Sequence, residues 1–383
     1  MTSAIANVRF VIPGRRTGSG TIELANGRIH AIHEHAVPPN APLLTPGLID
    51  LHTHGLGPHL YESDPDALRA AASLLPRYGV TCALPTLYRQ IRPSAVRELA
   101  AALPAHLPGL HLEGPFLALP GAGAQTLAGD VALLDSLLTA APNRIRAMSV
   151  SPDTPGILPV IERLRAAGVT VFLTHTRASV EQTIAAIETG AHHATHFYDV
   201  FPVPEVAEPG VRPVGVVETV LADPRVTVDF IADGVHVHPM AIRCALAAKG
   251  WSGVVLITDS NIGTGMEDGV YNTPWGFAVR VRAGDAARRS DTGELAGSVL
   301  TMNAGMRHLL RWLSDRPVEQ VWAMGTLNPA RVVGLERKGR LEVGADADLV
   351  LWDDDLNPIQ TWIGGECVFE NVSLGTRRVH SVS

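Results

Sequence analysis

Two histidines one residue apart, His52 and His54, end the largely apolar stretch 48–51. Alternate side chains of a β-strand share a face, so both imidazoles are expected to point to the same side. Two imidazoles at this spacing can bind one divalent ion, and imidazole suits zinc or a similar transition metal. The pair alone is equally compatible with two ordinary histidines near a turn, so the rest of the chain must supply further ligands.

Other residues that bind metals or transfer protons end five more predicted strands. They are Glu113, His175, His196, His236 and Asp259. Glu113, His175 and His196 make a three-ligand set with an open position, as catalytic zinc requires. His52 and His54 would hold a second ion, with Glu113 bridging the two.

This set of residues predicts hydrolytic chemistry. A bound divalent ion brings the pKa of water from about 15.7 to near 7, which yields a hydroxide nucleophile. Asp259 would accept the water proton and pass it to the leaving group, and His236 would help stabilise the oxyanion. The neighbouring His192 and His193 are expected to be structural, because at least one of them must face away from the site.

The elements that must position these residues alternate between strand and helix patterns. The predicted strands are 48–54, 80–87, 107–114, 144–151, 169–176, 191–197, 226–233 and 253–259; predicted helices include 66–78, 179–188 and 239–249. Eight such repeats predict an α/β fold, a (β/α)8 TIM-like barrel, whose active site lies at the carboxyl ends of the strands.

The chain ends have a different pattern, with alternating residues and a predicted Asn26-Gly27 hairpin turn. Short strands are expected at 339–344, 348–352 and 366–370. We therefore expect a small β-sandwich domain built from 1–47 and 339–383, and a barrel domain over 48–338. Residues 261–297 are expected to form a loop or hairpin over the barrel mouth, followed by helices at 298–313 and 317–324.

Composition excludes several classes of protein. The 383 residues carry a formal net charge of −7 without a basic stripe, so no nucleic-acid partner is expected. No apolar run is long enough to span a membrane. The three scattered cysteines fit a reducing, cytoplasmic location. The two lysines, Lys249 and Lys338, end no strand-like run, which argues against a Schiff-base or carbamylated lysine.

Taken together, the motifs resemble the amidohydrolase superfamily, and within it the N-acetylglucosamine-6-phosphate deacetylases. The matching segments are 46–55, 111–116 (His-Leu-Glu-Gly-Pro-Phe), 174–176, 190–196, 232–239, 257–259, 295–298, 326–330 and 344–350. The resemblance implies a metal-dependent barrel with an appended β-sandwich, usually a homodimer. It also implies hydrolysis of an N-acetylated amino-sugar phosphate, a small-molecule substrate, to acetate and free amine.

The resemblance also assigns roles to residues. It gives Glu113, His175 and His196 as metal ligands and Asp259 as the catalytic aspartate. His52 and His54 match the extra ligands of two-metal members, so one or two divalent ions per chain are expected, with zinc as the expected metal. The expected substrate-binding residues are Gln125, Asp199, Val200, His236, Ala296 and Gly297.

Several positions depart from the family pattern. Gln125 replaces a histidine that contacts substrate, and Asp199-Val200 replaces an Asn-Ala pair that helps to hold the phosphate. Ala207 replaces an arginine, for which Arg212 is a candidate substitute. Because an acidic Asp199 disfavours a dianion, the hypothesis is an amide hydrolase whose substrate lacks the 6-phosphate or carries a different group.

Other activities remain open on the sequence. An N-acyl-D-amino-acid hydrolase, a cyclic-amide hydrolase or a deaminase would use the same ligands, and acetate versus ammonia as product separates them. A non-catalytic binding protein on the same barrel predicts lost ligands, whereas here the full set is present.

Overall fold

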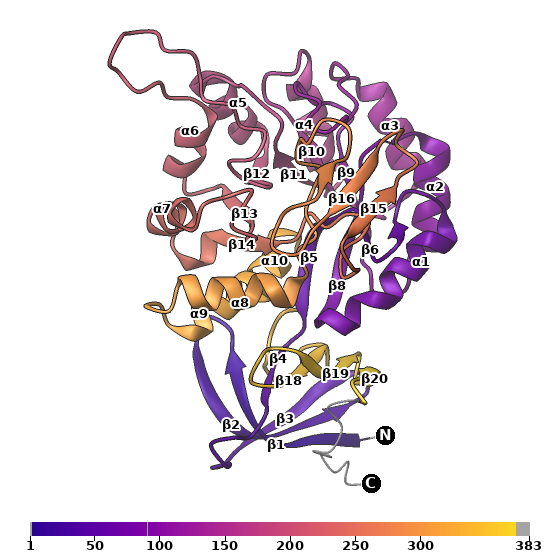
Figure 1. Cartoon of the computed structure of the whole chain (residues 1–383), viewed down its shortest axis with the longest axis vertical. Helices are drawn as coiled ribbons and strands as arrows, with labels where there is room; N and C mark the ends of the chain where they lie inside the picture. Colours follow the sequence, from indigo (N-terminus) through magenta and orange to yellow (C-terminus); the bar gives the residue numbers. More distant parts are fainter. Residues whose placement is uncertain (1, 90, 373–383) are drawn as a thin grey trace.

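The computed structural model describes residues 2–89 and 91–372, and eight parallel strands form its centre (Figure 1). The strands are β5 (Leu48–Thr53), β8 (Val80–Leu87), β9 (Leu110–Glu113), β10 (Ile145–Val150), β11 (Thr170–Leu173), β12 (Ala191–Ala194), β13 (Thr227–Ile231) and β14 (Val254–Ile257). They pair in chain order, from β5 to β14. The predicted α/β barrel is confirmed, and each predicted strand contains an observed one.

The barrel is closed by contacts between its first and last strands. The backbone N–H of Asp259 donates to the carbonyl of His52, and that of His54 donates to the carbonyl of Ser260, both at 2.8 Å. The buried Asp50 carboxylate accepts the Thr258 hydroxyl at 2.6 Å and its N–H at 3.2 Å. Closure therefore brings the first histidine pair next to Asp259.

Helices surround the strands and bury one apolar face against them (Figure 1). They are α1 (Pro65–Leu74), α2 (Pro93–Ala102), α3 (Val131–Ala140), α4 (Ile157–Ala166), α5 (Val180–Thr189), α6 (Val216–Ala222), α7 (Pro239–Lys249), α8 (Met302–Trp312), α9 (Val318–Gly325) and α10 (Leu327–Val332), with 3-10 turns at Leu75–Tyr78 and Trp251–Gly253. Asp64 caps α1 by accepting two backbone N–H groups at 2.8 Å. The helix predicted over 66–78 ends earlier, at Leu74, because Pro76 cannot continue it.

Both chain ends contribute to a second, seven-stranded sheet. Its strands are β1 (Thr2–Ile12), β2 (Arg16–Ala25), β3 (Arg28–Glu34), β4 (Leu43–Pro46), β18 (Leu349–Trp352), β19 (Pro358–Ile363) and β20 (Glu366–Glu370). Figure 1 shows β18–β20 above β1–β3, and Phe10, Ile22 and Leu351 share the apolar core of this unit. The predicted Asn26-Gly27 hairpin lies between β2 and β3.

Some details of the terminal unit differ from the prediction. Residues 339–344 form no strand, and the sheet is completed instead by β19, which the sequence pattern did not indicate. The division into 1–47 plus 339–383 and 48–338 stays a proposal, and 373–383 lie outside the described residues.

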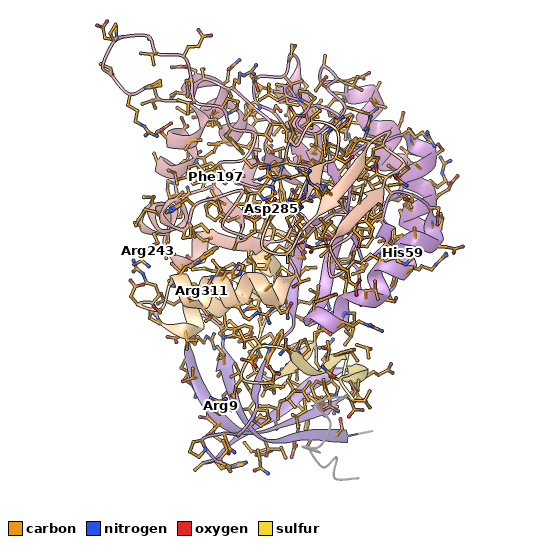
Figure 2. The ribbon with its side chains drawn as sticks, in the orientation of Figure 1. Arg9, His59, Phe197, Arg243, Asp285 and Arg311 are labelled. Atoms are coloured by element: carbon orange, nitrogen blue, oxygen red, sulfur yellow. The ribbon has the colours of Figure 1, made fainter. Side chains whose placement is uncertain are left out.

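A three-stranded antiparallel cap covers the mouth of the barrel. It consists of β15 (Gly269–Asn272), β16 (Ala278–Val281) and β17 (Arg288–Arg289), in front of the barrel strands in Figure 1, and its Asp285 is labelled near the centre of Figure 2. Trp275 fixes the cap to the barrel, because its indole N–H donates to Glu62 while its carbonyl accepts Arg89 at 2.6 Å. The hairpin expected within 261–297 is present.

Candidate metal centre

Three candidate residues occupy the same register beyond their strands. His175, His196 and Asp259 each follow the last residue of β11, β12 or β14 by two positions. All three have left-handed backbone, with φ of 50°, 33° and 49°. A non-glycine residue in this region is strained, and such strain clusters at functional sites. The left-handed backbone also explains why β11, β12 and β14 end before the strands predicted at 169–176, 191–197 and 253–259.

Glu113, at the end of β9, lies between two pairs of histidines. Its Oε1 is 3.1 Å from Nε2 of His175 and 3.1 Å from Nε2 of His196. Its Oε2 is 3.4 Å from Nε2 of His52 and 3.3 Å from Nε2 of His54. The side chain is 3% exposed. Each carboxylate oxygen thus faces one imidazole pair.

Asp259 completes the cluster from the other side of the barrel seam. Its Oδ1 is 3.0 Å from Nε2 of His54 and 3.5 Å from that of His52, and those two nitrogens are 3.3 Å apart. Two ligands of a tetrahedral ion bound at 2.0–2.1 Å lie about 3.3 Å from each other. The spacing of these donor atoms therefore fits a divalent ion. In two overlapping groups, His52–His54–Asp259 and His52–Glu113–His196, all donor atoms lie within 4.8 Å of one another.

The electrostatics of the cluster also demand positive charge. Burial opposes ionisation of Glu113, yet the surrounding imidazoles hold its pKa well below the usual range. The neighbouring imidazoles lower the pKa of Asp259 in the same way, again against the effect of burial. Burial alone would lower the pKa of His54, but Asp259 and Glu113 raise it to about 10. Two buried carboxylates are thus stabilised in their charged form, and a divalent ion can replace the imidazole protons that balance them.

The remaining imidazole nitrogens are held by the protein. His52 Nδ1 lies 2.9 Å from the Thr195 hydroxyl, and His175 Nδ1 donates to the Leu119 carbonyl at 2.8 Å. Such contacts fix the tautomer and aim Nε2 at the metal position. His193 lies behind the ligand His196 and contacts it through Asp229. The Asp229 carboxylate is 2.8 Å from Nε2 of His193 and accepts the backbone N–H of His196 at 2.5 Å. His192 is exposed.

The cluster opens into a cavity of about 240 Å³ under the cap. Of the six predicted substrate-binding residues, Asp199, Val200, Ala296 and Gly297 line it. Gln125 and His236 do not. His236 is anchored by Nδ1 to Asp233 at 2.7 Å, and its buried Nε2 has no hydrogen-bond partner among the described residues.

The sequence assigned no role in the site to several lining residues. They are Tyr88, Gly121, Ala122, Asn261, Trp275, Glu294 and Leu295. Tyr88 directly follows β8, so the rule that chemistry collects at the carboxyl ends of barrel strands could have found it. Trp275 and Glu294 belong to the cap, whose position depends on contacts with residues nearly two hundred positions away.

Comparisons with known proteins agree with this geometry. The amidohydrolase family model matches residues 43–368. The N-acetylglucosamine-6-phosphate deacetylase of Bacillus subtilis is 35% identical, with 86% of each chain covered. An N-acetylgalactosamine-6-phosphate deacetylase of Escherichia coli O157:H7 is 33% identical, with 90% of this chain and 93% of that one covered.

A solved structure is equally similar. A variant of the Mycobacterium smegmatis deacetylase, in complex with N-acetyl-D-glucosamine-6-phosphate, superimposes with a TM-score of 0.84 at 30% identity, covering 95% of this chain and 99% of that one. The match over nearly the whole length confirms the resemblance seen in the motifs. The chain belongs to the amidohydrolase family, and within it to the group of the N-acetylglucosamine-6-phosphate deacetylases.

Proposed function

We propose that this protein is a metal-dependent hydrolase that removes the acetyl group from an N-acetylated amino sugar. The observation that carries the proposal is the position of Glu113 between two histidine pairs, with Asp259 3.0 Å from His54. Glu113, His54 and Asp259 line the cavity under the cap. The names of the relatives support the same substrate class.

In this proposal His52, His54, Glu113, His175 and His196 hold the divalent ion or ions. When bound, such an ion polarises the acyl oxygen and lowers the pKa of water. Asp259 accepts a proton from the attacking water and returns it to the leaving nitrogen. One carbon–oxygen bond forms, the carbon–nitrogen bond breaks, and acetate and the amine leave. The buried Nε2 of His236 has no hydrogen-bond partner among the described residues.

The variant Asp259→Asn tests the proposal. We expect acetate release from N-acetylated amino sugars to fall by a factor of about 10²–10⁴, as loss of a general base implies. Metal content is measured in the same samples. The matched control is Asp315→Asn, on an exposed pair with Arg243 at the outer edge of the molecule (Figure 2).

Three outcomes would reject the proposal. Undiminished turnover in Asp259→Asn removes the role of this carboxylate. Ammonia rather than acetate as product indicates a deaminase. Wild-type protein that binds no divalent metal leaves only a binding function.

We also propose that the ion is zinc, that the protein is cytoplasmic, and that it is a homodimer. Donor chemistry supports zinc, since imidazole and carboxylate suit it. The three cysteines are free thiols, as a reducing compartment implies. No helix in the described part of the chain is long and apolar enough to cross a membrane.

The segment 202–214 supports the dimer. It extends away from the barrel between β12 and α6 (Figure 1) and exposes four apolar side chains, Val203, Val206, Val211 and Val214, at 57–80%. Exposed apolar residues that cluster on one segment mark an interaction site. Light scattering should give twice the chain mass for the wild type and a lower mass when these valines are replaced by serine.

A further inference from the structure

The charge of the cavity differs from what a phosphorylated sugar requires. Its described lining includes four carboxylates, those of Glu113, Asp259, Asp199 and Glu294, and no lysine or arginine. Glu113 and Asp259 belong to the metal cluster, where bound cations balance them. Asp199 and Glu294 lie outside that cluster, so their two negative charges face the substrate.

Asp199 is held in place at the cavity wall. Its backbone N–H donates to the His196 carbonyl at 2.9 Å, and its own carbonyl lies 3.3 Å from Nδ1 of His196. Both neighbours, Tyr198 and Val200, have left-handed backbone, with φ of 79° and 55°. This strain is stored at a lining position, where it fixes the direction of the side chain. Within the described chain the Asp199 carboxylate has no hydrogen bond or ion pair, so it is free to accept hydrogen bonds from a substrate.

Glu294 lies on the cap at the rim of the same cavity. It accepts the Thr292 hydroxyl at 2.9 Å, and its charge acts on the Arg289 guanidinium without forming an ion pair with it. The cap is fixed to the barrel through Trp275. The segment that carries Glu294 is thus held at the cavity, with the side chain itself exposed.

The arginines near these residues are already engaged. Arg89 donates to the Trp275 carbonyl at 2.6 Å. Arg289 pairs with Asp291 at 2.8 Å and lies over the Phe277 ring. Arg212, the candidate substitute for the missing family arginine, pairs with Glu218 at 2.8 Å and does not line the cavity. The His236 imidazole, next to the cavity, is matched by the Asp233 carboxylate.

We infer that the substrate is a neutral, unphosphorylated N-acyl amino sugar, and that Asp199 and Glu294 select it by accepting its hydroxyl hydrogens and repelling a phosphate. This rests on the proposed function. A phosphate monoester carries a charge of about −1.5 to −2 at pH 7. In this cavity it would meet two carboxylates outside the metal cluster and no lysine or arginine of this chain. Like-charge contacts of this kind are a means of rejecting the wrong ligand.

The test compares one matched pair of substrates. The metal-loaded enzyme is assayed with N-acetylglucosamine and with N-acetylglucosamine 6-phosphate, and kcat/KM is measured from acetate release. We expect at least tenfold higher kcat/KM for the unphosphorylated sugar. We expect Asp199→Asn and Glu294→Gln each to shift the ratio severalfold toward the phosphorylated sugar, while Asp315→Asn leaves it unchanged. Unfolding temperatures confirm that each variant is folded.

A wild-type preference for the phosphorylated sugar overturns the inference and leaves the proposed deacetylase intact. A ratio that neither carboxylate variant changes also overturns it. Absence of acetate release from both sugars, with metal bound, instead rejects the proposed function.

Discussion

At the scale of single residues, Glu113 organises the centre. Its side chain lies within 3.5 Å of all four histidines, because its two carboxylate oxygens face opposite pairs. A carboxylate that divides its oxygens in this way can bridge two ions. The half with His175 and His196 and the half with His52 and His54 each retain two imidazoles, so each half should bind an ion by itself.

We therefore predict two zinc ions per chain in the wild type and one in His54→Ala or in His175→Ala. Metal content is measured by mass spectrometry after gel filtration in metal-free buffer. His33→Ala, a half-exposed histidine paired with Glu23 on the terminal sheet, is the matched control and should retain both ions. One ion in the wild type, unchanged in His54→Ala, would show that the first histidine pair holds none.

The site residues differ in how far sequence could predict them. His52, His54, Glu113, His175, His196 and Asp259 follow from position alone, since polar residues at strand ends must meet at one end of a barrel. Asp199 and Val200 line the cavity, whereas Gln125 and His236 do not, and substrate binding by all four stays a prediction. The direction of the His236 side chain depends on the conformation of its own loop, in which Nδ1 contacts Asp233 three residues earlier, and no periodic pattern contains that conformation.

At the scale of elements, the seam between β5 and β14 decides whether the cluster forms. These two strands are farthest apart in sequence among the barrel strands, and the Asp50 carboxylate joins them by accepting the hydroxyl and the backbone N–H of Thr258. Burial raises the pKa of Asp50 to about 7, which shows how fully this group is withdrawn from water. Asp50 is thus a structural residue beside the metal centre.

We predict that Asp50→Ala lowers the free energy of unfolding by about 1–3 kcal/mol for each buried donor left without an acceptor. Asp50→Asn retains one acceptor oxygen and should lose less. Denaturant unfolding of both variants, each loaded with the same metal, measures the difference. Equal losses in the two variants would mean that packing at position 50, and not its hydrogen bonds, holds the seam.

Helices and strands could be predicted where a short stretch of sequence has a regular apolar pattern, and not where an element depends on contacts with distant residues. Strand–helix alternation located the eight barrel strands, because apolar runs and β-branched residues are local properties. Helix α10 was missed since Pro329 resembles a helix breaker, although near the helix start a missing N–H costs nothing. Strand β19 was missed because Pro358 and mixed polarity hide it, and only pairing with β18 and β20 makes it a strand.

At the scale of the whole molecule, the metal centre connects strands from the full circumference of the barrel. Ligand candidates come from β5, β9 and the residues that follow β5, β11, β12 and β14, so an ion bound among them would link residue 52 to residue 259. Without a cation the buried carboxylates depend on imidazole protons for balance. Metal binding should therefore contribute to the stability of the barrel as well as to catalysis.

Removal of the metal by a chelator should lower the unfolding temperature of the intact protein. An ion present at 1,000 times its dissociation constant adds about 4 kcal/mol to the stability of the folded state, since it binds that state alone. Differential scanning calorimetry before and after chelation, and after zinc is restored, measures the effect. Glu113→Ala, which removes the bridging oxygens, should unfold at a temperature that zinc no longer changes. The chelated wild type could instead unfold at the same temperature as the zinc-loaded form. That result would show that the barrel holds its ligands in place without the ion and that imidazole protons alone balance the charge of the cluster.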